Sequence, residues 1–363
     1  MIKWKALKQM NKSTRSNLIT VGLLILMYAV VQSMIARGSI SNLMQGLLVP
    51  ICYYSILAVS LNLTVGILGE LSLGHAGFMC VGAFSGAFFS KAMDTVITNN
   101  LLRFMMAILI GGLMAALFGI LIGVAVLRLR GDYLAIVTLA FGEIIKNVIN
   151  VLYIGIDSKG LHFSLKDAVH LNLEKDGEVI ISGAKGITGT PKQTTFTIAL
   201  ILLILVYLII SNLVNSRSGR AIMAIRDNRI AAESVGIDIT KFKILAFSLS
   251  AAMAGVAGVL YAHNLSSLSA TPKNFGYNMS IMILVFVVLG GIGNLRGSII
   301  AAIILTLLPE YLRFLKDYRM LIYAIVLIIM MIFNWNPRCI AWRKRYSIRG
   351  ALSAFLNKRK KEA

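Results

Sequence analysis

The sequence predicts an all-α, polytopic membrane protein with about ten transmembrane helices, of which eight to ten are full spans, and with both termini in the cytoplasm. Its residues are 58% hydrophobic and only 14% charged, whereas soluble domains are about 45–50% apolar and about 25% charged. A soluble fold could not bury this much apolar surface. The apolar residues also gather in long runs, and the basic residues concentrate at the ends of those runs.

Ten apolar segments are the candidate spans, because a helix needs about 20 residues to cross the bilayer core. The first run is too long for a signal peptide and lacks a clear cleavage site, so we expect an uncleaved transmembrane helix. The joins near Gly69–Leu71 and Asn294–Gly297 are very short, and broken or re-entrant helices are expected there. The segments are 18–36, 43–66, 72–90, 104–127, 134–154, 195–214, 244–262, 279–294, 298–314 and 319–334.

The distribution of charge sets the orientation. With the N-terminus inside and ten spans, the cytoplasmic pieces hold 23 Lys and Arg against five acids, and the outer pieces hold twelve against seven. This bias follows the positive-inside rule. It predicts a basic cytoplasmic N-terminus at 1–17, a transmembrane domain at 18–334 and a basic cytoplasmic tail at 335–363. The tail is interpreted as an anchor on anionic lipid, and a role in nucleic-acid binding is the weaker alternative.

The outer loop at 155–194 contains five lysines and five acids, a balance that suits an extracytoplasmic surface. Its pattern predicts a short strand over 177–182 and a short amphipathic helix over 163–173. Two interpretations stay open for this loop. It is either a cap that meets an external partner or a structured linker.

Charged residues inside the apolar segments are costly and need partners or water. Glu143 and Lys146 are three residues apart and share a helix face. Glu143 lies eleven residues beyond Asp132, which at 1.5 Å per residue is about 16 Å deep, near the middle of the bilayer. The pair is either a gate along a pathway or an internal tie between helices. His75 is interpreted as a packed polar group, since no second ligand is spaced to share a metal with it.

Several motifs of enzymes are absent from the sequence. There is no Gly-Lys dipeptide and hence no Walker A phosphate loop, and GxSxG, HExxH and CxxC are also missing. The three cysteines indicate neither a disulfide framework nor a metal site. We therefore expect no enzymatic activity and no cofactor in this chain, so that any ATP and Mg²⁺ would be bound by a separate polypeptide.

The polar segment 215–243 is predicted to form two short helices, over 220–225 and 228–235. Asp227 or Asn228 is the expected cap of the second helix, and Gly236 is the expected stop. A predicted apolar side is ringed by arginines. Such a helix could seat in a groove of a soluble partner or rest on lipid headgroups. The residues of the apolar side are Ile222, Ile225, Ile230 and Val235.

Four blocks of sequence resemble the LivM-type permeases, which are membrane subunits of ATP-binding-cassette importers for branched-chain amino acids. The polar segment and the helix after it, GRAIMAIRDNRIAAESVGIDITKFKILAFSLSAAMAGVAGVLYA, resemble the EAA-type loop of that family. The other blocks are LNLTVGILGELSLGHAGFMCVGAF, LRLRGDYLAIVTLAFGEIIKNVI and MILVFVVLGGIGNLRGSIIAA. Together they cover much of the chain from about residue 61 to 314, in family order. The element GITGTP in the outer loop also resembles a family pattern.

The resemblance implies a set of partners and a location. The partners are a second, related permease subunit in a heterodimer, two ATPase subunits and an extracytoplasmic substrate-binding protein. The location is the bacterial plasma (inner) membrane, which the chain would cross many times. Within the permease domain, 215–243 would be the coupling loop. The residues implied to contact an ATPase are Gly219, Arg220, Ala224, Arg226, Asp227, Ala231, Glu233 and Gly236.

The expected function is therefore import of leucine, isoleucine and valine by alternating access. One alternative keeps the architecture and changes the cargo to urea or amides, other amino acids, nucleosides or sugars. Another is an ion-coupled secondary transporter that uses Glu143 and Lys146 as a charge relay. A membrane-embedded enzyme is a third class, but the sequence shows no nucleophile or metal-binding cluster that would support it. The expected pathway residues are Asn62, Ser72, His75, Thr138, Glu143 and Lys146.

Overall fold

The computed structural model describes residues 12–39, 41–94, 96–126, 131–157, 160–173, 177–313 and 318–335. The chain divides into two compact units, of which the first ends at Thr306 and the second begins at Leu307. Both predicted basic ends, 1–17 and 335–363, lie for the most part outside the described residues. Their placement in the cytoplasm therefore stays a prediction.

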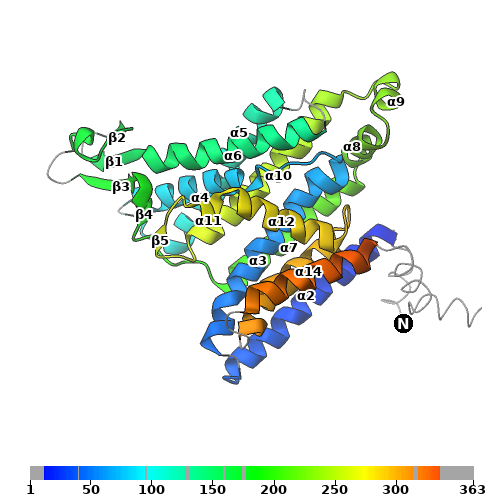
Figure 1. The fold of residues 1–363 in the computed structure, drawn as a ribbon. Coiled ribbons are helices and arrows are strands. Elements are labelled where there is room, and N and C mark those ends of the chain that lie inside the picture. Colours follow the sequence, from blue (N-terminus) through cyan, green and yellow to red (C-terminus); the bar gives the residue numbers. More distant parts are fainter. Residues whose placement is uncertain are drawn as a thin grey trace, which may run out of the picture. The chain divides into compact units, whose positions relative to one another are not determined.

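The described chain is mainly helical (Figure 1), as the sequence predicts. Each of the ten predicted apolar segments contains a helix. The helices of the first unit are α2 (Lys12–Ala36), α3 (Asn42–Asn62), the π-helix η1 (Leu63–Leu68), α4 (His75–Ala92), α5 (Asn100–Val126), α6 (Asp132–Val151), α7 (Phe196–Asn215), α8 (Arg217–Asp227), α9 (Arg229–Ser234), α10 (Ile239–Ala262), α11 (Pro272–Phe275) and α12 (Tyr277–Gly290). Helix α13 (Leu295–Tyr311) crosses the boundary between the units, and α14 (Arg319–Trp335) belongs to the second unit.

Seven of the described helices are long and apolar enough to cross a membrane. They comprise α2, α5, α6, α7, α10, the continuous rod of α3 and η1, and α11 with α12. Helices α4, α13 and α14 are shorter, with 18, 17 and 17 residues. The expected membrane-spanning helical fold is thus confirmed, whereas the number of eight to ten full spans stays a prediction.

Helix α10 forms the centre of the first unit and packs against α5, α4 and α3. Glycines allow its close approach to α4. A Cβ atom at Gly82 would lie 2.3 Å from the Cα of Gly255, and one at Gly258 would lie 2.1 Å from the carbonyl oxygen of Met79. Helices in lipid associate through such close packing, because the hydrophobic effect does not drive them together there.

Two small antiparallel sheets lie at the end of the first unit that follows α6 (Figure 1). The strands are β1 (Tyr153–Asp157), β2 (Gly160–Ser164), β3 (Glu178–Ser182), β4 (Ile187–Thr188) and β5 (Ser267–Leu268), with short 3-10 turns at Val169–Leu171 and Gly183–Lys185. The order in the larger sheet is β2-β1-β3, and β4 pairs with β5.

The strand predicted over 177–182 is confirmed as β3, but the helix predicted over 163–173 is wrong. Phe163 lies in β2 and pairs with Ile154 of β1. Because this hairpin satisfies the backbone hydrogen bonds of β2, the amphipathic pattern of the segment serves a strand and a 3-10 turn, and no helix forms.

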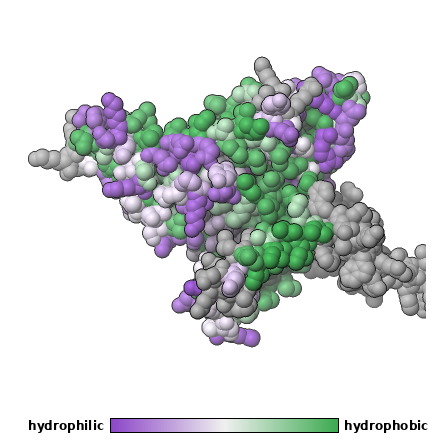
Figure 2. All heavy atoms as spheres, in the orientation of Figure 1, coloured by the Kyte–Doolittle hydropathy of each residue, from purple (hydrophilic) through white to green (hydrophobic). Residues whose placement is uncertain are grey.

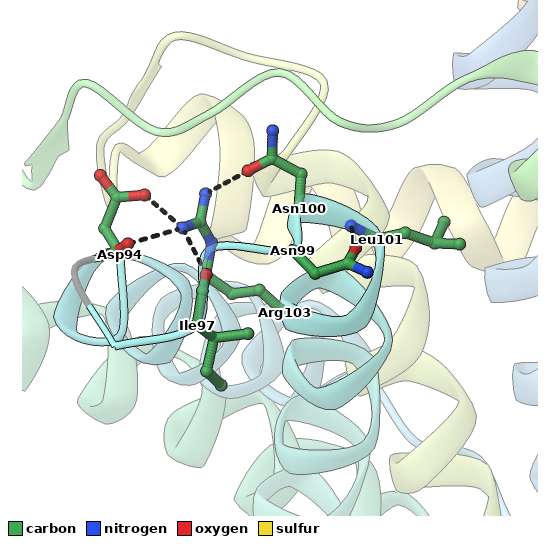
Figure 3. A network of polar contacts seen from close by, with 6 residues as sticks. All are labelled: Asp94, Ile97, Asn99, Asn100, Leu101 and Arg103. Atoms are coloured by element: carbon green, nitrogen blue, oxygen red, sulfur yellow. Dashed lines mark hydrogen bonds and ion pairs between the residues drawn. The ribbon is translucent and has the colours of Figure 1, made fainter.

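Arg103 fixes the connection between α4 and α5 at the same end of the unit (Figure 3). It lies in the first turn of α5 and its side chain is only 3% exposed. The guanidinium pairs with the carboxylate of Asp94 and donates to the carbonyl oxygens of Asp94 and Ile97, each at 3.2 Å. It also donates to Asn100 Oδ1 at 2.9 Å. A buried cation is tolerated here because it has several acceptors.

Polar and apolar side chains are separated along the first unit (Figure 2). Hydrophilic residues gather over the sheets and over α8 and α9, and apolar residues cover the helices between these two regions. A band of apolar surface between two polar ends is what a bilayer requires.

Candidate functional site

Two helix breaks lie within the apolar bundle. The first separates η1 from α4: the C-cap residue of η1 is Gly69, whose φ of +80° is left-handed, and α4 begins at His75. The second separates α11 from α12 at Gly276, within one candidate span. The interruption expected near 69–71 is therefore present. Near the other short join, α12 and α13 are separated by a turn at 291–294.

The starts of α4 and α12 meet, although they are about two hundred residues apart in sequence. The backbone N–H of Ala76, in the first turn of α4, donates to Ser280 Oγ of α12 at 3.1 Å. Just before α4, the N–H of Leu73 donates to Thr138 Oγ1 of α6 at 3.1 Å. These bonds satisfy N–H groups that the beginning of a helix leaves without intrahelical partners.

Glu143 of α6 lies at the start of α12. Its Oε1 accepts from the N–H of Tyr277 at 2.9 Å, and its Oε2 pairs with Lys146 one turn along α6. A carboxylate is stabilised at this position because the N-terminus of a helix carries a partial positive charge. The structure thus gives the Glu143–Lys146 pair the role of a tie between helices. Its action as a gate stays a prediction.

Asn62 joins α3 to the turn between α12 and α13. Its side chain is fully buried; Nδ2 donates to Ser298 Oγ at 2.7 Å, and Oδ1 accepts from the N–H of Gly293 at 2.8 Å. Both ends of the amide are thereby satisfied, as a buried amide requires. Sequence reasoning selected Asn62 but missed its partners, because nothing local in the sequence relates residues so far apart.

His75 and Ser72 complete the set of predicted pathway residues. His75 is buried, and its Nε2 lies 2.8 Å from Ser60 Oγ, which agrees with the interpretation of a packed polar group. Ser72 is 2% exposed, and its hydroxyl has no hydrogen-bond partner among the described residues. Five of the six residues thus make polar contacts around the breaks, whereas their role in conduction stays a prediction.

The segment 215–243, called the elbow below, contains the two predicted helices, α8 and α9. Ser216 caps α8, and its side chain accepts from the N–H of Gly219 at 3.2 Å. Asn228 is the cap of α9, and its Oδ1 accepts from the N–H of Ala231 at 3.1 Å. After α9 the chain turns at Gly236, where φ is +83°.

The predicted apolar side of the elbow is wrong as a single surface. Ile222 and Ile225 of α8 are buried, but Ile230 and Val235 are 80% and 74% exposed. The reason is the extended backbone at Asn228, where φ is −155° and ψ is 106°. It interrupts the helical periodicity, so apolar residues on its two sides do not form one stripe.

The elbow is held against the first helix break. Arg226 donates from Nη1 to the carbonyl oxygen of Gly66 in η1 at 3.0 Å, and it also pairs with Asp227. At the beginning of α10, Lys243 pairs with Glu70 and is buried. These residues lie far apart in the sequence, and only the tertiary structure brings them together.

A cavity of about 300 Å³ opens between the elbow, the first helix break and the start of α6. Its wall combines aliphatic and charged side chains. They include Leu68, Glu70, Asp132, Leu134, Arg226 and Lys243.

Broken helices that meet inside an apolar bundle, with a polar elbow attached to one of the breaks, are typical of the membrane subunit of a transport protein. A family model described as branched-chain amino acid transport system / permease component matches residues 43–332. The chain belongs to this family.

Known relatives support the assignment. The chain is 35% identical to the high-affinity branched-chain amino acid transport system permease protein LivM of Escherichia coli K12, over 90% of this chain and 75% of the relative. It is 34% identical to LivM of Salmonella typhimurium, over 84% of this chain and 70% of the relative. A probable LivM of Methanocaldococcus jannaschii is 25% identical over 67% of this chain and 74% of the relative. No solved structure matches the chain.

Proposed function

We propose that the chain is the membrane-spanning subunit of an ATP-binding-cassette importer that carries leucine, isoleucine and valine across the bacterial plasma membrane. The observation that carries the proposal is the similarity to two LivM permeases along 84% and 90% of the chain. A second, related permease subunit completes the pathway as a heterodimer, and a substrate-binding protein delivers the amino acid. This chain holds no cofactor of its own, and ATP with Mg²⁺ binds to two separate ATPase subunits.

The ATPase contact of this subunit is centred on α9. Ile230 and Val235 are the two most exposed large apolar side chains of the elbow, and Ala231 and Glu233 are also exposed. An exposed apolar anchor with charged neighbours is the surface that a groove on a soluble partner accepts. Of the residues implied by the family resemblance, we therefore propose that Ala231 and Glu233 of α9 touch the ATPase.

The substrate passes by alternating access. Closure of the ATPase dimer displaces the elbow, and the helix breaks allow the flanking spans to change their packing. A zwitterionic amino acid requires polar groups inside the membrane, and the polar side chains around the breaks supply them. The pathway residues we propose remain Asn62, Ser72, His75, Thr138, Glu143 and Lys146.

Reconstitution tests the proposal. We expect proteoliposomes that contain the chain with its second permease subunit and ATPase subunits to take up leucine only with ATP and the binding protein. Excess isoleucine or valine should compete for this uptake. Competition by urea, a nucleoside or a sugar, without competition by isoleucine, would show that the importer carries that compound and not branched-chain amino acids. Uptake by this chain alone, driven by a proton or sodium gradient, would contradict ATP-driven import and identify an ion-coupled transporter.

A further inference from the structure

We propose that Arg226 is a positioning residue that transmits movement of the elbow to the first helix break, rather than a residue that contacts the ATPase. The inference rests on the proposed function and deepens it, because it names the link between ATP hydrolysis and the transport pathway. The link runs from Arg226 to Gly66, then to Asn62 and to the turn at Gly293.

The first step is the contact between α8 and η1. The carbonyl oxygen of Gly66 lies in the last turn of η1, where carbonyl groups lack intrahelical partners and a cation is favourable. Arg226 Nη1 donates to this oxygen at 3.0 Å. The side chain also fills the space beside Gly69, where a Cβ atom would lie 2.5 Å from Arg226 Cγ. A guanidinium therefore fits the end of η1 both by charge and by shape.

The second step is an ion pair that attaches the C-terminal end of the elbow to the same helix break. Glu70 follows η1 directly, and its carboxylate pairs with Lys243 in the first turns of α10. The Lys243 side chain is only 6% exposed. Arg226 near the middle of the elbow and Lys243 at its end thus both hold the segment 66–70, so the elbow cannot shift without moving this segment or breaking a charged contact.

The third step leads from η1 into the bundle. A Cβ atom at Gly66 would lie 1.9 Å from Asn62 Oδ1 and 2.3 Å from the backbone nitrogen of Gly293. There is no free space at this contact, and close-packed groups transmit displacement instead of absorbing it. Asn62 in turn bonds to Gly293 and to Ser298 at the start of α13. A displacement of Gly66 therefore reaches the turn between α12 and α13.

The last step is the presence of elements that can change conformation. η1 is a π-helix, a geometry that is rare and often found at functional positions. Gly69, Gly291 and Gly293 all have positive φ, between +80° and +95°. These glycines can take up large changes in backbone angle, as hinge residues do. The link therefore connects the elbow to two turns of the bundle that contain glycines with positive φ.

The test uses the complete complex in proteoliposomes with three variants of this chain, Arg226→Gln, Arg226→Lys and Arg217→Gln. Arg217 is the matched control, because it lies on the same helix, is exposed, and is not among the residues implied to contact the ATPase. We expect Arg226→Gln to keep its ATPase subunits and its ATPase activity while the ATP hydrolysed per leucine transported rises about tenfold, since a hydrogen bond from a charged group is lost. Arg226→Lys should restore part of the coupling, and Arg217→Gln should leave it unchanged.

A second measurement follows the far end of the link. A spin label at Ile292→Cys, which is 48% exposed in the turn between α12 and α13, should change mobility when ATP binds. We expect this change to disappear in Arg226→Gln and to persist in Arg217→Gln, with the chain without the added cysteine as the labelling control.

Three outcomes would overturn the inference. Normal coupling together with a normal spin-label response in Arg226→Gln would show that the contact transmits nothing. Loss of the ATPase subunits from Arg226→Gln on purification would assign Arg226 to the ATPase interface. ATP-independent uptake by the unsubstituted complex would instead refute the proposed function itself, and this result is visible before any variant is compared.

Discussion

Several buried or half-buried polar side chains hold backbone groups that the broken helices leave unsatisfied. Glu143 accepts from the first N–H of α12, Thr138 accepts just before α4, and Asn62 accepts in the turn after α12. Leaving such groups unpaired in a bilayer costs several kcal/mol each, on the order of 1–3 kcal/mol even in a protein interior. The need to pair these backbone groups is therefore sufficient to account for polar side chains at these positions.

His263 offers a prediction at the scale of one residue. It follows α10, is fully buried, packs against the ring of Phe104, and its Nδ1 lies 3.0 Å from the carbonyl oxygen of Val259. Burial is the largest cause that lowers the pKa of His263 from 6.5 to about 4, and nearby Arg103 lowers it further. The folded state therefore keeps the ring neutral at a pH where the unfolded state binds a proton.

The sign of the pH effect follows from this difference. Stability should fall as the pH drops from about 6.5 towards 4, by about 3 kcal/mol at most for this group. Thermal denaturation of the detergent-solubilised chain between pH 7.5 and 5.0 measures it. We expect a smaller loss of stability over this range in His263→Gln than in the unsubstituted chain. Equal pH dependence in the two proteins would show that His263 is not the titrating group.

At the scale of elements, the elbow shows how the backbone conformation of one residue, Asn228, interrupts a helical pattern of apolar residues. Local rules predict both helices, the Asn228 cap and the Gly236 stop, and the structure confirms them. The extended backbone at Asn228 then separates Ile222 and Ile225, which pack inside, from Ile230 and Val235, which stay exposed. The two helices accordingly have different roles in the proposal, with α8 facing the bundle and α9 facing the ATPase.

The packing of α8 gives a prediction for Gly219. A Cβ atom there would lie 2.2 Å from the carbonyl oxygen of Leu213 and 2.4 Å from that of Val214, so Gly219→Val must displace α8 from the end of α7. We expect this variant to insert into the membrane but to uncouple ATP hydrolysis from leucine uptake. The control is Gly22→Val in α2, where a Cβ atom meets nothing within 4 Å. Unchanged coupling in Gly219→Val would argue against a coupling role for α8.

At the scale of the whole molecule, the separation of polar ends predicts an orientation that labelling can test. Val169, near the sheets, is 82% exposed, and Glu233 of α9 is also exposed. Lys and Arg are more numerous on the side of the membrane that holds the elbow, which predicts that this side is cytoplasmic. Val169→Cys should therefore react with an impermeant maleimide in intact cells, whereas Glu233→Cys should react only after permeabilisation. The chain without added cysteines gives the background. Labelling of Glu233→Cys in intact cells would reverse the orientation and remove the elbow from any cytoplasmic ATPase.

The amino-acid sequence alone determined which segments are apolar helices, that the elbow holds two short helices with Asn228 as the cap of the second, and to which family the chain is similar. These properties depend on composition, on capping residues and on patterns within a few turns, so they can be read locally. The helix expected over 163–173 fails because its residues find strand partners in β1, a contact that no local pattern contains.

Only the tertiary structure decided which polar residues meet. Asn62 and Ser298 are 236 residues apart in sequence, Arg226 and Gly66 are 160 apart, and the starts of α4 and α12 join through Ala76 and Ser280. Such contacts arise because helices pack where small residues allow their backbones to approach and where buried polar groups find partners. Both conditions belong to pairs of surfaces in space, and for that reason the chain's local sequence could not specify them.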